Sequence, residues 1–174
     1  MNTPYYELTV PFFEKNLRSL KTILAKGAAH ATSVGMSEAD LLASRLAPNM
    51  FTLVQQVQVA TDNAKGATAR LAGAEPMSLV DNEMTVAALI TRIEKVEAYL
   101  ATFTAEQFTD AADRKITLPY FPGKFISGQD YLSEYALPNF FFHLNMTYAI
   151  LRMVGVPLEK ADYIGGANFK ELPA

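Results

Sequence analysis

The chain has 174 residues, of which 50% are hydrophobic and 19% are charged, and this composition excludes an intrinsically disordered protein. A chain of this length can bury roughly 70% of the surface that its unfolded form exposes, so we expect a single domain over residues 1–174. The net charge of −3 and the scattered basic residues argue against nucleic acid as a partner. The absence of cysteine excludes disulfides, thiolate metal ligands and a cysteine nucleophile.

No segment of the sequence has the pattern of a secretory signal or of a membrane-spanning helix. The apolar N-terminal stretch has no basic residue before it and is interrupted by Glu7 and Pro11. The most apolar segment, residues 137–156, contains Asn139 and Arg152 and lacks the about 18 consecutive apolar residues that a bilayer requires. We therefore expect a soluble, cytoplasmic protein that has no membrane partner.

Two long segments in the first half of the chain have apolar residues at the three- and four-residue steps of an amphipathic helix. The first is predicted over residues 10–34, and Gly35 ends it. The second is predicted over residues 37–73, with a bend at Pro48 and a stop at Gly73.

Two further helices and a hairpin are predicted in the second half. Residues 86–100 form the clearest amphipathic pattern, with Arg92 among the charges that face outward. Residues 115–126 have the turn signals of a small β-hairpin. The last helix is predicted over residues 127–154 and kinks at Pro138. Four long helices with one hairpin before the last predict an all-α protein, a helical bundle.

His143 is the leading candidate for chemistry. At about 100° per residue, Phe140, Thr147 and Ile150 project from the same side of the helix, so His143 is expected to face the bundle interior. A histidine there is either a hydrogen-bonded core residue or a metal ligand or acid–base group. Asn139 precedes it by one turn and either shares a ligand site or repairs the backbone after the proline.

Two glutamines and the second histidine are weaker candidates. Gln56 and Gln58 interrupt an apolar stretch, and Gln56 is expected to point inward if only one of them does. An inward amide could orient a ligand, and the alternative is that both are solvated. His30 lies near the end of the first helix, where its charged form favours the helix dipole, and we expect it to be structural.

Short segments spread along the chain form a pattern that covers nearly its whole length. They are Val10–Pro11, Leu46–Pro48, Met50–Phe51, Gln56–Gln58, Asp62, Ala64–Gly66, Ala69–Gly73, Gly128–Leu132, Leu137–His143, Tyr148–Arg152, Gly155–Pro157 and Lys160–Gly165. In these segments the chain resembles an uncharacterised bacterial branch of the DinB/YfiT-like superfamily. The resemblance implies an up-down-down-up four-helix bundle, commonly a homodimer, in which relatives bind a divalent metal through three histidines.

The resemblance also places the metal ligands. Counting back from Gly155 aligns His143 with the second histidine of the family's H-x-x-x-H pair and Asn139 with the first. The third ligand falls at Gln55–Gln58, where this chain has no histidine. A three-histidine site needs three imidazoles to hold zinc or nickel with an open position, so the sequence predicts a degenerate metal site that retains only His143.

Three functions follow from these residues. The first is a bundle that binds or converts a small molecule in a polar pocket of His143, Asn139 and Gln56 or Gln58, with His143 as the catalytic base. The second is a non-catalytic dimeric scaffold or stress-associated interaction protein. The third is a diverged metal-dependent transferase or hydrolase that holds zinc or nickel through His143.

Overall fold

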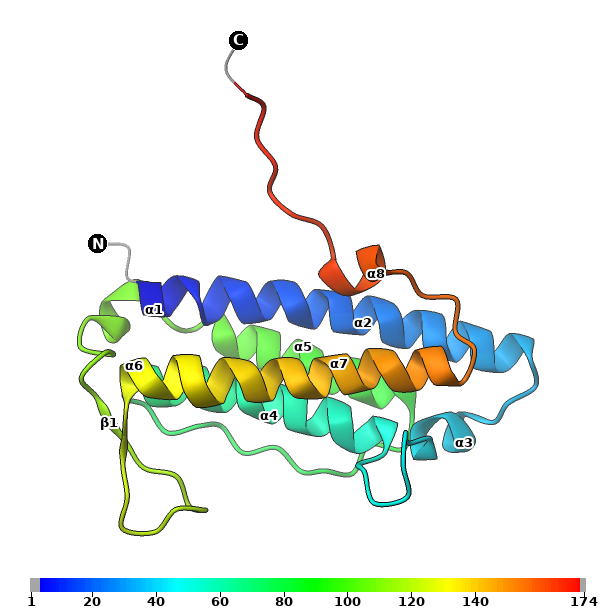
Figure 1. Cartoon of the computed structure of the whole chain (residues 1–174), viewed down its shortest axis with the longest axis horizontal. Coiled ribbons are helices and arrows are strands. Elements are labelled where there is room, and N and C mark those ends of the chain that lie inside the picture. Colours follow the sequence, from blue (N-terminus) through cyan, green and yellow to red (C-terminus); the bar gives the residue numbers. More distant parts are fainter. Residues whose placement is uncertain (1–3, 173–174) are drawn as a thin grey trace.

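The computed structural model of the protein describes residues 4–172, and it is mostly helical. Four long helices make up the body of the molecule (Figure 1): α2 (Val10–Ser33), α4 (Leu53–Ala72), α5 (Val86–Leu100) and α7 (Leu137–Met153). The short elements are α1 (Pro4–Glu7), α3 (Glu38–Ala43), η1 (Ala105–Phe108), β1 (Lys115–Ile116), β2 (Ile126–Ser127), α6 (Gly128–Asp130), η2 (Tyr131–Ala136) and α8 (Lys160–Ile164). The predicted all-α bundle is confirmed.

The long helices follow the up-down-down-up order. In Figure 1, α2 and α7 run in one direction and α4 and α5 in the other. This order requires a crossover, and residues 73–85 run back along the length of the bundle before α5 begins. None of the helices in residues 4–172 is long and apolar enough to cross a membrane.

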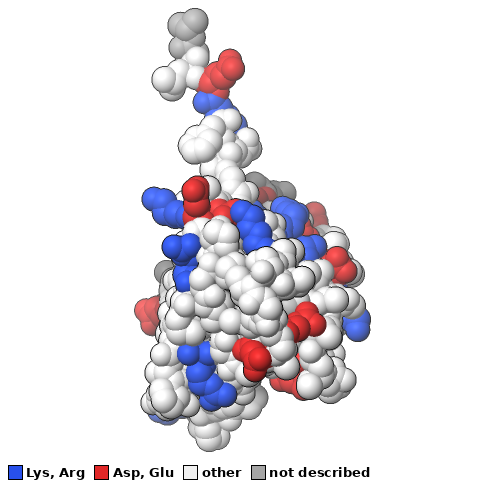
Figure 2. All heavy atoms as spheres, turned by 90° about the vertical axis from the view of Figure 1, so that its right-hand side faces the viewer, with Lys and Arg blue, Asp and Glu red and all other residues white. Residues whose placement is uncertain are grey.

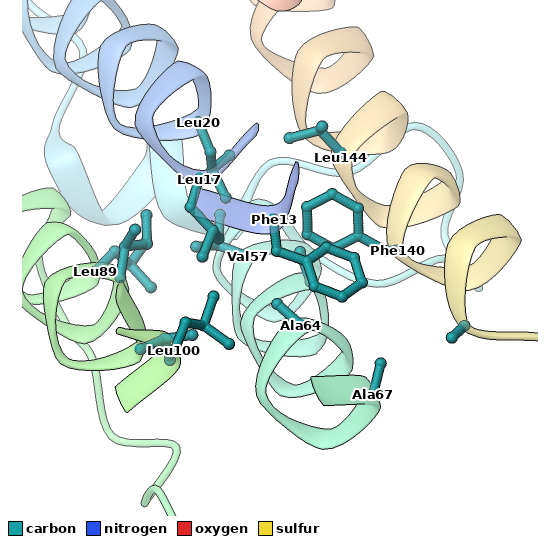
Figure 3. Packing of buried hydrophobic residues seen from close by; sticks show 14 of the residues in the cluster. Phe13, Leu17, Leu20, Val57, Ala64, Ala67, Leu89, Leu100, Phe140 and Leu144 are labelled. Carbon is teal, nitrogen blue, oxygen red and sulfur yellow. The ribbon is translucent and has the colours of Figure 1, made fainter. Parts of the chain in front are cut away.

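The core lies between the four long helices (Figure 3). Apolar side chains from each helix meet there and are almost fully buried; they include Phe13, Leu17 and Leu20 of α2, Val57 and Ala64 of α4, Leu89 and Leu100 of α5, and Phe140 and Leu144 of α7. Each large side chain contributes about 1.5–3 kcal/mol on burial. The alanines of α4 are small, so α7 can approach this helix closely.

The second predicted helix is wrong as a single unit. The structure divides it into α3 and α4, and residues 44–52 between them are not helical. Pro48 has no backbone N–H and restrains the residue before it, so the helix cannot run through. A capping box then starts α4, in which the Gln55 side-chain oxygen accepts a hydrogen bond from the Thr52 backbone N–H at 3.0 Å.

The outward placement of Arg92 is also wrong. Its side chain is buried and holds the crossover against α4. The Nε donates to the Thr61 hydroxyl at 2.8 Å and Nη2 donates to Asp62 at 2.8 Å, while Nη1 reaches Asp81 at 2.9 Å and Glu83 at 3.1 Å. We call these five residues the Arg92 cluster. A buried guanidinium with several oxygen partners is tolerated because its donors are satisfied.

The hairpin and the last long helix form as predicted, with shorter strands and a local change at the proline. Ile116 pairs with Ile126 in the antiparallel register. Before Pro138 the backbone forms the π-helical turn η2, in which the Leu137 N–H donates to the carbonyl of Leu132, five residues back. The helix axis continues from η2 into α7 (Figure 1), so the wider turn accommodates the proline where a kink was predicted.

Candidate functional site

His143 and Gln56 face each other across the contact between α7 and α4. The Nδ1 of His143 lies 2.7 Å from the side-chain oxygen of Gln56. Both residues are buried, with His143 7% exposed and Gln56 1% exposed. Two polar groups in an apolar helix interface remain there because each satisfies the other.

The amide of Gln56 is oriented by a second hydrogen bond. Its Nε2 donates to the backbone carbonyl of Phe51 at 3.3 Å, and a carbonyl oxygen only accepts. The Gln56 oxygen is therefore the atom that faces His143, and Nδ1 of the imidazole carries the hydrogen. The hydrogen-bond network thus assigns the tautomer, in which Nε2 is unprotonated and can accept a hydrogen bond.

The surroundings of His143 keep the imidazole neutral. Burial lowers the pKa of His143 below its ordinary value of 6.5. The Phe51 ring stacks on the imidazole with centroids 6.2 Å apart, and the Phe142 ring meets it edge-on at 5.1 Å. Both phenylalanines are about half exposed, so His143 lies directly beneath the molecular surface.

Asn139 lies one turn from His143 and makes its contact with a residue that sequence reasoning missed. Its Nδ2 donates to the side-chain oxygen of Asn63 at 3.1 Å. The Nδ2 of Asn63 is buried and has no hydrogen-bond partner in the described part of the chain. The signal in the sequence was available, because Asn63 follows Gln56 by seven residues and so lies on the same face of α4.

A third polar pair continues this line. Arg70 follows Asn63 by a further seven residues, and its Nη1 donates to the Tyr131 hydroxyl at 3.3 Å. Burial raises the pKa of Tyr131, which keeps the phenol neutral. We call the three pairs, Gln56–His143, Asn63–Asn139 and Arg70–Tyr131, the polar seam. It runs along one helix contact of an otherwise apolar core.

Gln58 does not join the polar seam. It leaves α4 on another side, and its Nε2 donates to the Glu83 carboxylate at 2.8 Å. Although burial favours the neutral acid, hydrogen bonds from Gln58 and Arg92 outweigh it and lower the pKa of Glu83. The structure therefore places Gln58 beside the Arg92 cluster and away from His143.

His30 lies about three helical turns from His143, at the end of α7. A Cβ built on Gly155 would come within 3.2 Å of the His30 Nε2, so the ring packs against the turn that follows α7. It brings no second imidazole to His143.

The donor set around His143 does not fit zinc or nickel. One imidazole and two amides are the side chains at the three positions that the resemblance assigns, and the Gln56 oxygen already accepts the Nδ1 hydrogen. Within residues 4–172, no three His, Cys, Asp or Glu side chains are grouped to hold a metal ion. Amides are poor ligands for zinc and nickel compared with imidazole.

Three cavities lie apart from His143, and the charges at one end of the bundle are mixed in sign. Cavities of about 820, 340 and 230 Å³ are present in the described structure, and His143 lines none of these three. Figure 2 views the end of the bundle at which α3 and the C-terminal end of α7 lie. Basic and acidic side chains are interspersed there, so the coloured part of this face has no continuous basic surface for a phosphate backbone.

Comparison with known proteins places the chain in a family. Residues 5–164 match DUF1993, a domain of unknown function. A DinB family member protein from Shewanella denitrificans, known from a crystal structure, is 40% identical in sequence to this chain, and the two structures superpose with a TM-score of 0.92. The match covers 96% of this chain and 95% of that one. No protein with curated annotation matches the chain. The chain therefore belongs to the DUF1993 family and has the fold of a DinB-like bundle.

Proposed function

We propose that the protein binds or converts a small molecule at His143, and that the imidazole Nε2 accepts a hydrogen bond or a proton from it. The observation that carries the proposal is the bond between the His143 Nδ1 and the Gln56 oxygen at 2.7 Å. This bond and the contact of Gln56 with the Phe51 carbonyl leave one nitrogen of a neutral imidazole as a free acceptor.

The chemistry of this acceptor defines the class of ligand. A neutral imidazole nitrogen accepts from weakly acidic O–H, S–H or N–H groups, and as a general base it removes such a proton. Asn139 lies one turn from His143 on α7, and its partner Asn63 lies about two turns from Gln56 on α4. The buried Nδ2 of Asn63 lacks an acceptor among the described residues. A ligand with both an acidic hydrogen and a carbonyl-type acceptor would satisfy these groups.

We propose that a movement of Phe51 widens the access to His143. This residue belongs to the non-helical segment 44–52, and its half-exposed ring stacks on the imidazole. A rotation of the Phe51 side chain would open the imidazole to solvent without breaking a long helix. A planar ligand could then occupy the position of the ring and keep the stacking contact.

The test uses phenol and benzyl mercaptan as O–H and S–H probes. Long-range ¹H–¹⁵N correlation spectra resolve the two histidines of the chain. We expect the Nε2 resonance of His143 to shift as either probe is added, and the binding to disappear in His143→Gln. His30→Gln is the matched control and should bind as the wild type does. A His143 Nε2 resonance that neither probe moves at millimolar concentration would refute the proposal.

The proposed site works without a metal, because its donors do not suit zinc or nickel. A diverged metal-dependent transferase or hydrolase would instead need His143 to bind one of these ions. Elemental analysis of the wild type and of His143→Ala, after incubation with both metals and removal of loosely bound ions, separates the two proposals.

A cytoplasmic, non-catalytic homodimer is the second candidate function, in which the protein acts as a scaffold. Phe51 and Phe142, which are 48% and 50% exposed, both contact the His143 ring. They favour the scaffold, because a second copy could cover both rings. Sedimentation of the wild type and of Phe142→Ser distinguishes the candidates. A dimer that dissociates in this variant, together with failure of both probes to bind, would favour the scaffold.

A further inference from the structure

A large cleft lies at the end of the bundle remote from Phe51. It has a volume of about 820 Å³ and lies between the C-terminal end of α4 and the hairpin that contains β1, at the left of Figure 1. This volume is within the range of about 300–1,000 Å³ that small-molecule sites occupy. Arg70 of the polar seam lines it, but His143, Gln56, Asn63 and Asn139 do not, so a ligand here is independent of the proposed function.

The charge of the cleft is strongly positive. Arg70, Arg114, Lys115 and Lys124 line it, against the single acidic side chain of Glu75, which is exposed. Within residues 4–172, none of these four cationic groups has a carboxylate within 4.0 Å. The cationic groups therefore remain available to an anion.

Arg114 is the residue best placed to bind an anion. Its Nε is buried and has no hydrogen-bond partner among the described residues, which is a costly state for a charged donor. Its guanidinium lies over Gly73, which ends α4 with a φ of +74°, and a Cβ at this position would overlap the Nη1 of Arg114. Gly73 thus leaves the space that the arginine occupies. A ligand oxygen would supply the missing acceptor.

An apolar pocket adjoins the charged groups. It has a volume of about 230 Å³, and Phe121, Phe125 and Tyr135 form much of its wall. Phe121 and Phe125 also line the larger cleft, so the two spaces share a wall. The Phe121 and Tyr135 rings meet edge-on at 6.4 Å, and Lys115 lies 5.0 Å above the Phe125 ring. Cationic and aromatic surfaces are therefore side by side.

We propose that this cleft binds an amphipathic organic anion. The carboxylate or phosphate head would lie at Arg114 and Lys124, and the apolar body would enter the pocket that Phe121, Phe125 and Tyr135 line. Such an anion would satisfy the buried Nε of Arg114 and cover apolar surface in the same step.

Two sources supply this chemistry: a free anion in solution and an anionic lipid at a bilayer surface. Tyr120 and Phe125 at the hairpin are 82% and 60% exposed, which suits contact with a lipid interface as well as with a free ligand. The shared element is an anionic head beside an apolar chain, and the experiment separates the sources.

Octanoate is the free probe and 1-octanol its uncharged counterpart, both measured by calorimetric titration of the full chain. We expect octanoate to bind more tightly than 1-octanol. Loss of one charge-assisted hydrogen bond should weaken octanoate binding about tenfold in Arg114→Gln, with a smaller loss in Lys124→Gln. Lys95→Gln removes an exposed positive charge from α5 and should bind octanoate as the wild type does.

Thermal melting of each variant reports whether it folds. If Arg114→Gln does not fold, Lys124→Gln still tests the proposal, because Lys124 is exposed. Co-sedimentation with phosphatidylcholine vesicles, with and without phosphatidylglycerol, is the second arm. Binding only to the anionic vesicles, weakened in Lys124→Gln, would support the proposal with a lipid as the source. Equal affinity for octanoate and 1-octanol, equal affinity of all variants, or no binding in either arm would overturn it.

Discussion

His143 and Gln56 are 87 residues apart in the chain, and their side chains join α7 to α4 through a 2.7 Å contact between Nδ1 and the amide oxygen. Both groups are nearly inaccessible to water, so neither can replace a lost partner with solvent. The same contact selects the imidazole nitrogen that carries the hydrogen. Helix packing and the chemistry of the candidate site therefore depend on one bond.

Gln56→Leu tests the structural weight of this bond. The substitution leaves the His143 Nδ1 hydrogen and the Phe51 carbonyl without their partner, which should lower the free energy of unfolding by about 1–3 kcal/mol. Urea denaturation measures the change. Gln56→Glu is the matched variant, because its carboxylate still accepts from Nδ1 and should raise the pKa of His143. A leucine variant as stable as the wild type would show that the bond contributes nothing.

Zinc binding can be tested in the wild type and in a variant with added histidines. The wild type should retain no zinc after removal of loosely bound ions, because His143 is the one imidazole at the site. The double variant Gln56→His, Asn139→His supplies two more imidazoles, one across the α4–α7 contact and one on the preceding turn of α7. It should retain about one equivalent of zinc. Elemental analysis decides, and retention by the wild type that depends on His143 would refute the metal-free account.

The sequence predicted the bundle well because helix periodicity and end signals are local properties. The boundaries of α2 and α5 and the stop at Gly73 follow from apolar spacing and capping residues within a few positions of each other. The sequence predicted only a bend at Pro48, whereas the structure has a non-helical segment between α3 and α4. A proline in an apolar stripe permits either a bend or a break of the helix. The capping box at Thr52 starts a new helix and so favours the break.

Arg92→Leu tests the cluster that holds the crossover. The substitution leaves Glu83 without its cationic partner in a partly buried setting, and Asp62 keeps only Lys65, at 3.1 Å. The free energy of unfolding should therefore fall by about 3–5 kcal/mol. Lys95→Leu on the exposed face of α5 is the control and should change it by less than about 0.5 kcal/mol. Chemical denaturation of both variants measures the difference, and equal effects would contradict the structural role of the cluster.

The pH dependence of stability tests the neutral state of His143. Because burial lowers its pKa below 6.5 in the folded protein, the unfolded chain takes up the proton first as the pH falls. The free energy of unfolding should therefore decrease from about pH 7 toward the folded-state pKa of His143. His143→Gln should show a shallower decrease between about pH 7.5 and 5. The contribution of the Glu83 carboxylate to the free energy of unfolding is lost at lower pH, below the ordinary glutamate pKa of 4.5. Identical slopes would contradict the assignment.

Side-chain partners in the site depend on contacts between helices, which the sequence pattern does not contain. Periodicity placed His143 and Gln56 on inward faces, but no local rule brings them to the same level of the bundle. Asn63 was missed because it stands between Asp62 and Lys65, in a stretch that resembles a solvated flank of the helix. Arg92 was placed outside because a charged residue at an inward position has no visible partner until the crossover packs against it.

The tautomer of His143 shows directly whether Gln56 orients a neutral imidazole whose Nε2 is free to accept a hydrogen bond. Long-range ¹H–¹⁵N correlation at neutral pH distinguishes the two ring nitrogens. We expect Nδ1 to carry the hydrogen in the wild type and this preference to weaken in Gln56→Leu. A His143 that carries its hydrogen on Nε2, or that is protonated at both nitrogens, would contradict this expectation.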